Sequence, residues 1–235
     1  MKTYLLLLLG ALGCTPVFGQ QWRIAPTVGV NLATISYSNA YLNLFTSNGS
    51  RVSPGFVPRW QVGALIDYTI SEQVGIRSGL LYSTRGSNIQ TSVTRSGYTV
   101  TASGSNQINY LDVPLLVTVG LGENGFRLVG GLVLGIALSG TSKTDAYTVA
   151  GYKFDGEEAK LPIGNSSNDR IVPTDVSVSL GILKQLDLNR RFLELGFHIQ
   201  PSLSSFATGT KQYPSYTSTY FQFGLKASYF FDIGR

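Results

Sequence analysis

Hydrophobic and polar residues alternate with a period of two along much of this chain. In the clearest stretch one face carries Trp60, Val62, Ala64, Ile66, Tyr68 and Ile70, and the other carries Arg59, Gln61, Gly63, Leu65, Asp67 and Thr69. This period is typical of a β-strand, in which successive side chains point to opposite sides of the sheet. The pattern recurs and predicts eight strands, near residues 22–37, 59–70, 74–85, 107–119, 126–140, 174–186, 191–203 and 221–231.

The connections between these strands alternate in length. The short ones are 71–73, 120–125 and 187–190, and the long polar ones are 38–56, 86–106, 141–173 and 204–218. Transmembrane barrels are built this way, with short turns on one side and long loops on the other. The apolar face lacks charges and carries the aromatics, which is the reverse of a water-soluble barrel. The pattern therefore predicts an all-β, eight-stranded antiparallel up-and-down transmembrane β-barrel.

Composition supports this interpretation and excludes several others. Charged residues are 13% of the 235 residues, about half the usual share of about 25%. The best apolar run after the N-terminus, 128–138, has 11 residues and includes three glycines, too short for a spanning helix of about 20 residues. The net charge of +5 is too dilute for a nucleic-acid surface. One cysteine and one histidine predict no metal or other cofactor.

The N-terminus has the features of a secretory signal peptide. Lys2 precedes an apolar run from Tyr4 to Leu12, and a small-residue stretch ends at Gly19. This order predicts cleavage before Gln20, which leaves residues 20–235 as a single barrel domain. Cys14 leaves a second possibility open, namely lipid attachment at a lipoprotein cleavage site.

Aromatic residues are predicted to form two girdles on the lipid-facing side. The girdle toward the long loops contains Tyr37, Trp60, Tyr82 and Phe221, and that toward the short turns contains Tyr68, Phe126, Tyr229 and Phe231. Eight strand positions separate Trp60 from Tyr68, which is about 27 Å along the strand. At a tilt of about 40° this rises about 20 Å, close to the apolar band of about 25 Å.

Charged and polar residues on the opposite face are predicted to fill the lumen. They are Arg59, Asp67, Arg77, Arg85, Asp112, Arg127, Asp175, Glu194, His198 and Lys226. Charges withdrawn from water must pair, because an unpaired buried ion costs several kcal/mol. If Ile70 lies opposite Val74 across the turn 71–73, then Asp67 lies opposite Arg77. The sequence thus predicts an Asp67–Arg77 salt bridge in a barrel that its own side chains close.

Two motifs suggest chemistry and are better explained by structure. Residues 120–125 spell the dinucleotide-binding string G-x-G-x-x-G, but a strand-like segment follows instead of the required helix. His198 raises the possibility of a lipid-modifying hydrolase. Glu194 lies four positions away on the same strand, about 13 Å, and no G-x-S-x-G nucleophile motif exists. We therefore interpret His198 as a lumen hydrogen-bonding group and expect no catalytic residues.

Two segments carry a family resemblance. They are Tyr110-Leu111-Asp112-Val113-Pro114-Leu115-Leu116-Val117, followed by Gly130, Gly131 and Gly135, and Gly79-Leu80-Leu81-Tyr82-Ser83-Thr84-Arg85-Gly86. With them the chain after the signal peptide resembles the PorT-like outer-membrane β-barrel family of Gram-negative bacteria. The resemblance implies an outer-membrane barrel and little about activity.

The favoured function is a non-enzymatic outer-membrane scaffold whose long loops bind partners or assist envelope assembly. A small-solute channel and a lipid-modifying hydrolase remain as alternatives. The expected partners are outer-membrane lipid and lipopolysaccharide, together with envelope or surface proteins, and the expected state is a monomer that binds no nucleic acid. Basic loop residues that would face lipopolysaccharide are Arg51, Arg95, Lys143, Lys153, Lys160, Arg170 and Lys211.

Overall fold

A computed structural model of the chain describes residues 21–47, 49–95, 98–122, 124–149, 152–166, 168–188, 191–207 and 217–233. Its elements are β1 Gln21–Tyr37, α2 Asn39–Thr46, β2 Ser50–Gly55, β3 Val57–Thr69, β4 Val74–Arg95, β5 Tyr98–Leu121, β6 Phe126–Thr144, β7 Tyr147–Val149, β8 Tyr152–Phe154, β9 Glu157–Lys160, β10 Thr174–Leu188, β11 Arg191–Pro201 and β12 Ser218–Ile233. The predicted signal peptide lies outside the described residues.

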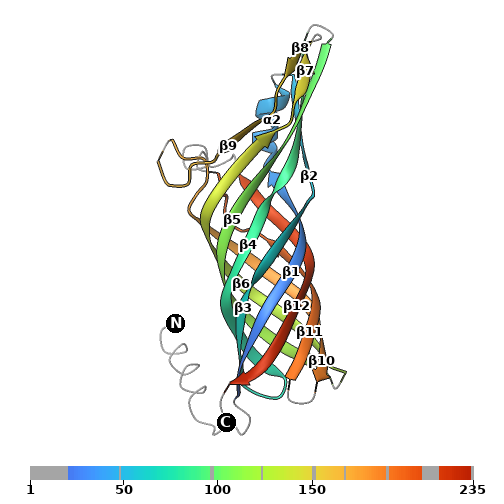
Figure 1. The fold of residues 1–235 in the computed structure, drawn as a ribbon, viewed down its shortest axis with the longest axis vertical. Coiled ribbons are helices and arrows are strands. Elements are labelled where there is room, and N and C mark those ends of the chain that lie inside the picture. The colour runs from blue at the N-terminus through green and yellow to red at the C-terminus, as the bar shows by residue number, and fades with distance from the viewer. Residues whose placement is uncertain are drawn as a thin grey trace.

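Eight of the described strands form a closed antiparallel ring. Its order is β1, β3, β4, β5, β6, β10, β11 and β12, and β12 pairs again with β1. Neighbours in the chain are neighbours in the ring, so the topology is up-and-down (Figure 1). The prediction of an eight-stranded antiparallel barrel is confirmed.

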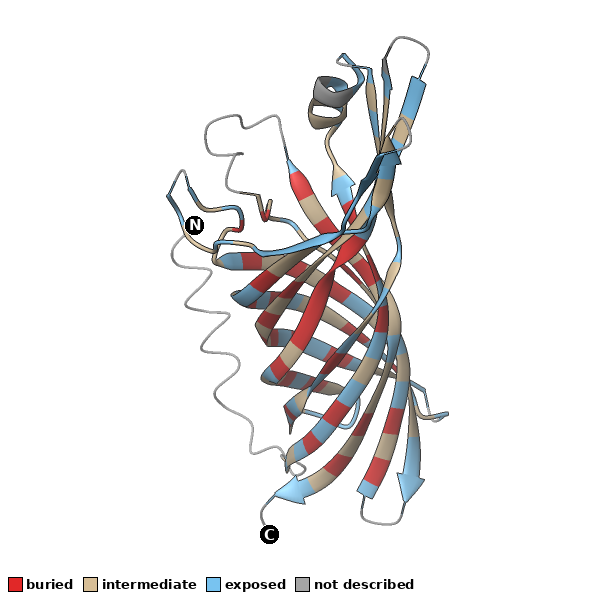
Figure 2. Ribbon diagram, turned by 45° about the horizontal axis from the view of Figure 1, so that its top comes forward, coloured by how far each residue is buried: buried red, intermediate tan, exposed pale blue. Residues whose placement is uncertain are grey.

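The two faces of the barrel differ as the alternation predicts. On β1, Val28 and Val30 point outward and are 55% and 62% exposed, whereas Thr27 and Asn31, which flank them, are buried. Buried and exposed positions alternate along the ring strands (Figure 2). The barrel thus carries an apolar outer surface around a polar interior. Such a surface suits a hydrocarbon solvent, because apolar side chains face the lipid and backbone groups bond within the closed sheet.

Apolar clusters close the polar interior toward both ends. At the long-loop end the buried residues are Ile35, Ile108, Tyr110, Ile171, Phe206 and Tyr220. At the short-turn end Ala25, Leu65, Leu81, Phe192 and Phe230 pack together. Arg77 and Arg85 lie 4.8 and 4.3 Å from the ring centres of Phe230 and Tyr110 in these clusters, and both arginines are buried away from bulk water.

The segment 86–106, expected to be a polar loop, is instead mainly strand. Cross-strand pairs continue from Gly86–Gln107 to Arg95–Tyr98, so β4 and β5 extend far past the ring. A strand was predicted only where one of its two faces is apolar, but these extensions have polar residues on both faces. Their Thr and Val residues still favour a strand. Backbone hydrogen bonds between β4 and β5 hold the two extensions together, and this pairing does not depend on an apolar face toward lipid.

Other strands widen this extension into a sheet. β2 pairs with β4, β6 continues along β5, and β9 pairs with the end of β6. We call this arrangement of β2, β4, β5, β6 and β9 the surface sheet (Figure 1). The loop 38–56 therefore contains α2 and β2, and 141–173 contains β7, β8 and β9. No helix among the described residues is long and apolar enough to cross a membrane.

The short connection after β3 is a tight turn. After β3, the backbone N–H groups of Ile70 and Ser71 both donate to the carbonyl oxygen of Val74, at 2.9 and 3.0 Å. In the turn before β6, Gly122 and Gly125 both have φ of +67°, a conformation that favours glycine. The glycines of the G-x-G-x-x-G string therefore serve a turn between two strands.

Candidate functional site

Arg77 occupies the centre of a buried cluster in the lumen. Its Nε and Nη2 donate to Asp67 Oδ1 and Oδ2 at 3.2 and 3.3 Å, which confirms the predicted cross-strand salt bridge. Its Nη1 and Nη2 also donate to Glu194 Oε1 and Oε2, at 2.5 and 3.1 Å. The guanidinium lies 4.8 Å from the ring centre of Phe230. The fork geometry of arginine allows it to bind two carboxylates at once.

The position of Glu194 makes this cluster a bridge across the barrel. Arg77 is on β4 and Glu194 is on β11, four places apart in a ring of eight strands. The two strands therefore lie on opposite walls. An interaction between them has to cross the lumen, so the Arg77 cluster obstructs the interior at its short-turn half.

A second arginine cluster lies nearer the long loops. Arg85, also on β4, donates from Nη2 to Asp112 Oδ1 on the adjacent β5 at 2.6 Å, and from Nη1 to Asp175 on β10. The hydroxyl of Ser83 donates to Asp112 Oδ2 at 2.6 Å, and that of Ser204 donates to Asp175 Oδ1 at 2.8 Å. Because β10 is three places from β4 in the ring, this cluster also spans the interior.

Charge pairing in the lumen is unequal. Each cluster places one arginine between two carboxylates, so each has a formal charge of −1 if all groups are ionised. Lys226 lies on the inward face of β12, half-buried. Arg127 donates to the hydroxyl of Thr118 at 2.9 Å, and Arg59 donates to the backbone oxygen of Asn106 at 2.6 Å. Within the described chain these three cations form no ion pair closer than 4.0 Å.

The lumen also contains buried polar side chains outside the two arginine clusters. His198 is buried, and its Nε2 lies 3.4 Å from the amide nitrogen of Gln61. The amide atoms of Asn31 and Gln222 have no hydrogen-bond partner among the described residues. Glu194 is bound to Arg77, which is consistent with the sequence argument against an acid that orients His198.

The alternation placed Gln61 on the inward face, but the predicted lumen network did not include it. Asn31 and Gln222 were also left out of that network, although they occupy inward positions of their strands. Among the described residues no group of three His, Cys, Asp or Glu side chains could hold a metal ion.

Seven of the eight aromatic residues predicted for the girdles lie on the outer face of the barrel. Trp60 stacks on Tyr82 with ring centres 5.3 Å apart, and Tyr229 meets Phe231 edge-on at 4.8 Å. Tyr68 lies 4.7 Å from Trp22, which sequence reasoning missed. Phe126 and Phe221 also lie on the outward face.

Tyr37 does not belong to the lipid-facing girdle. It packs against the cluster that contains the buried Ile35, and its ring stacks on Tyr41 of α2 at 5.0 Å. The outward positions of β1 are even-numbered, as at Trp22 and Val28. Tyr37 therefore falls on the inward face, and assigning it by its nearness to the strand end was wrong.

The comparison with protein families agrees with this architecture. A family model described as outer membrane protein beta-barrel domain matches residues 18–234. Among solved structures, Ail, the attachment invasion locus protein of Yersinia pestis, in complex with the heparin analogue sucrose octasulfate, is 11% identical. That similarity covers 90% of this chain and 99% of Ail, with a TM-score of 0.37.

A second solved structure is the outer membrane protease OmpT from Escherichia coli. It is 9% identical, with a TM-score of 0.44, and the similarity covers 94% of this chain and 100% of OmpT. A search of curated proteins found no match.

Proposed function

Because this chain belongs to the family of outer membrane protein beta-barrel domains, we propose that it is a closed, non-enzymatic scaffold that presents the surface sheet for binding. The barrel lies in the outer membrane, so the surface sheet stands on its long-loop, outer side. The segments 79–86 and 110–117 support placing it among PorT-like barrels. Lipopolysaccharide surrounds such a barrel and is its expected lipid partner.

The observation that carries this proposal is the bridge from Arg77 to Glu194. A solute that passes through the lumen would have to separate a buried guanidinium from carboxylates on both walls. Separating such a pair leaves uncompensated charges in a region of low dielectric, at a cost of about 3–5 kcal/mol. The Arg85 cluster presents a second barrier of the same kind. Two successive charge bridges favour a closed barrel over a channel.

Extension of the strands past the ring supports the binding role. β4 has 22 residues and β5 has 24, whereas crossing the membrane takes about 9–11. The additional length forms a paired sheet and is therefore ordered by backbone hydrogen bonds. A rigid scaffold that holds loops and edges in place is the usual arrangement for recognition.

Single-channel recording in planar bilayers tests the closed barrel. We expect no sustained conductance from the wild-type protein. Removing both bridges, with alanine at Asp67, Arg77 and Glu194 and also at Arg85, Asp112 and Asp175, should produce open events. Arg51→Ala, outside the ring on β2, is the control and should stay closed. Steady conductance of the wild type would overturn the proposal in favour of transport.

The enzymatic alternative is tested on the same preparation. Wild-type protein and His198→Ala are compared for hydrolysis of phospholipid, lipopolysaccharide acyl chains and peptide substrates. We expect no turnover by either protein above an empty-vesicle control. Turnover by the wild type that His198→Ala abolishes would overturn the non-enzymatic assignment.

A further inference from the structure

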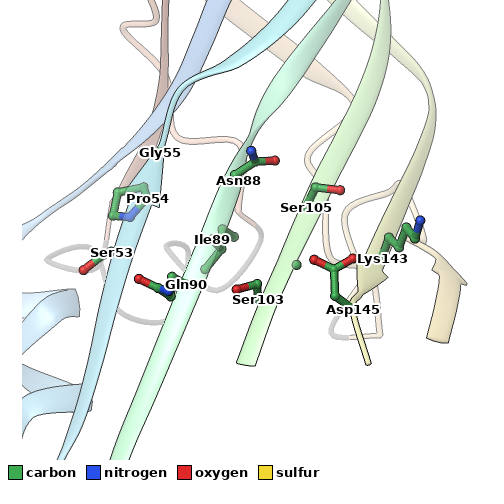
Figure 3. Close-up of a pocket in the computed structure, with 11 residues that line it drawn as sticks. Ser53, Pro54, Gly55, Asn88, Ile89, Gln90, Ser103, Ser105, Lys143 and Asp145 are labelled. Atoms are coloured by element: carbon green, nitrogen blue, oxygen red, sulfur yellow. The ribbon is translucent and has the colours of Figure 1, made fainter. Parts of the chain in front are cut away.

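The surface sheet carries a polar groove on one face. Its volume is about 510 Å³, and it is lined by residues of β2, β4, β5 and β6 and by Asp145, which follows β6 (Figure 3). It lies outside the ring and shares no residue with the lumen clusters. The groove takes no part in closing the barrel.

The strand register aligns the groove's side chains into two rows. In the first row Asn88 on β4 lies opposite Ser105 on β5, and Ser105 lies opposite Lys143 on β6. Residues directly opposite one another in neighbouring strands point to the same side of a sheet. At the β2 end of this row stands Gly55, opposite Asn88. Because glycine has no side chain, the groove stays open there.

The second row runs parallel to the first, two residues further along each strand. Ser53 on β2 lies opposite Gln90 on β4, and Gln90 lies opposite Ser103 on β5. The row ends at Asp145, whose backbone N–H donates to the carbonyl oxygen of Ser103 at 2.8 Å. Positions two apart on a strand share a face, so both rows line the same side.

These groove side chains are not engaged with one another. Further along the same face, Ser92 bonds Thr101 at 3.1 Å and Thr94 bonds Thr99 at 2.9 Å between side-chain oxygens. By contrast, the side chains of the two rows form no hydrogen bond or ion pair to other described residues. Asn88 and Gln90 are also exposed to solvent. The two rows therefore present free donors and acceptors in the groove.

The chemistry of the rows selects a class of ligand. They offer three hydroxyls, two carboxamides, one ammonium group and one carboxylate, with no net charge and no aromatic ring. Hydroxyls and amides both donate and accept, which matches a chain of hydroxyl groups. A polyanion would meet the Asp145 carboxylate, and an apolar peptide would leave these polar groups unpaired.

We propose that this groove binds a neutral oligosaccharide through the side chains of the two rows. The inference deepens the proposed scaffold function and rests on it, because the groove reaches external glycans only from the outer membrane. Two sources carry the same chemistry: the sugar chains of lipopolysaccharide in the same envelope, and glycans on another cell. Asn88 and Gln90 stand at the centre of the rows, so they make the largest share of the contacts.

Binding is measured on the full chain in lipid nanodiscs. The probes are dephosphorylated, delipidated lipopolysaccharide polysaccharide, a neutral N-linked glycan, a heparin octasaccharide and an apolar decapeptide. We expect at least one neutral glycan to bind, and Asn88→Ala with Gln90→Ala to weaken it at least fivefold. Tighter binding of the polysaccharide would identify lipopolysaccharide as the source of the ligand, and tighter binding of the N-linked glycan would identify glycans on another cell.

The control lies on the same face of the same strand. Ser92→Ala with Thr94→Ala removes hydroxyls that are already paired, so affinity should change less than twofold. The difference in denaturing-gel mobility between heated and unheated samples shows whether both double variants are folded. The proposal is overturned if neither neutral glycan binds, if binding survives the Asn88 and Gln90 substitutions, or if the heparin octasaccharide or the decapeptide binds more tightly. Bilayer conductance is independent of this groove, so failure of the closed barrel would be seen separately.

Discussion

Replacing Arg77 by methionine is expected to destabilise the barrel strongly. The substitution removes the contacts to both Asp67 and Glu194 and leaves two carboxylates in the lumen with their shared cation gone. Removing one partner of a buried ion pair costs about 3–5 kcal/mol. Methionine keeps much of the arginine volume, so the cost of a cavity stays small. We therefore expect a loss of about 3–5 kcal/mol.

Neutralising the stranded carboxylates should restore stability in two steps. Asp67→Asn in the Arg77→Met background should recover part of the loss, because Glu194 still carries an uncompensated charge. Adding Glu194→Gln should recover most of the remainder, since a neutral polar lumen avoids the ionic penalty. Such dependence of one substitution on another is the signature of direct interaction in a mutant cycle.

Urea unfolding in lipid vesicles measures these free energies. Both tryptophans, Trp22 and Trp60, lie on the outer face, so their fluorescence reports loss of contact with lipid. Arg51→Met is the control, because Arg51 is exposed on β2 and should change stability by less than about 0.5 kcal/mol. A loss below about 1 kcal/mol for Arg77→Met, or additive effects across the three substitutions, would refute the reasoning.

Three further predictions concern packing, processing and orientation. Gly79→Ala should destabilise the barrel by about 1–3 kcal/mol, because a Cβ there would overlap the backbone of β3. Gly120→Ala, whose Cβ would meet its nearest neighbours at 3.6 Å, is the control, and equal effects in urea unfolding would contradict the argument. The intact mass of the envelope form should correspond to an unlipidated chain beginning at Gln20, whereas a lipid-modified mass would contradict the predicted cleavage. Protease added to whole cells should cut within 145–156 and spare 71–73. The opposite pattern on blotting would show that the barrel has the opposite orientation in the membrane.

Much of the barrel was predictable from the sequence because its rules are local. Side chains alternate every residue, so the apolar Val62 and the polar Gln61 had to face opposite sides. The sharp turn after Ile70 set the register of its hairpin, and Asp67 then had to lie opposite Arg77. The long connections, in contrast, were predicted by the absence of apolar alternation, which cannot distinguish a loop from a two-faced polar strand. The extensions of β4 and β5 were missed for that reason.

The closed tertiary structure decided which side chains meet across the lumen. Glu194 is more than a hundred residues from Arg77 in the chain, and no hairpin register relates them. They meet because ring closure puts β11 opposite β4 and because strand tilt and stagger bring the two side chains to one height. The sequence thus determined which residues face inward, and Tyr37 belongs with them once the parity of β1 is followed. Only the closure of the ring determined which inward residues touch, since contacts across a barrel depend on the geometry of all eight strands together.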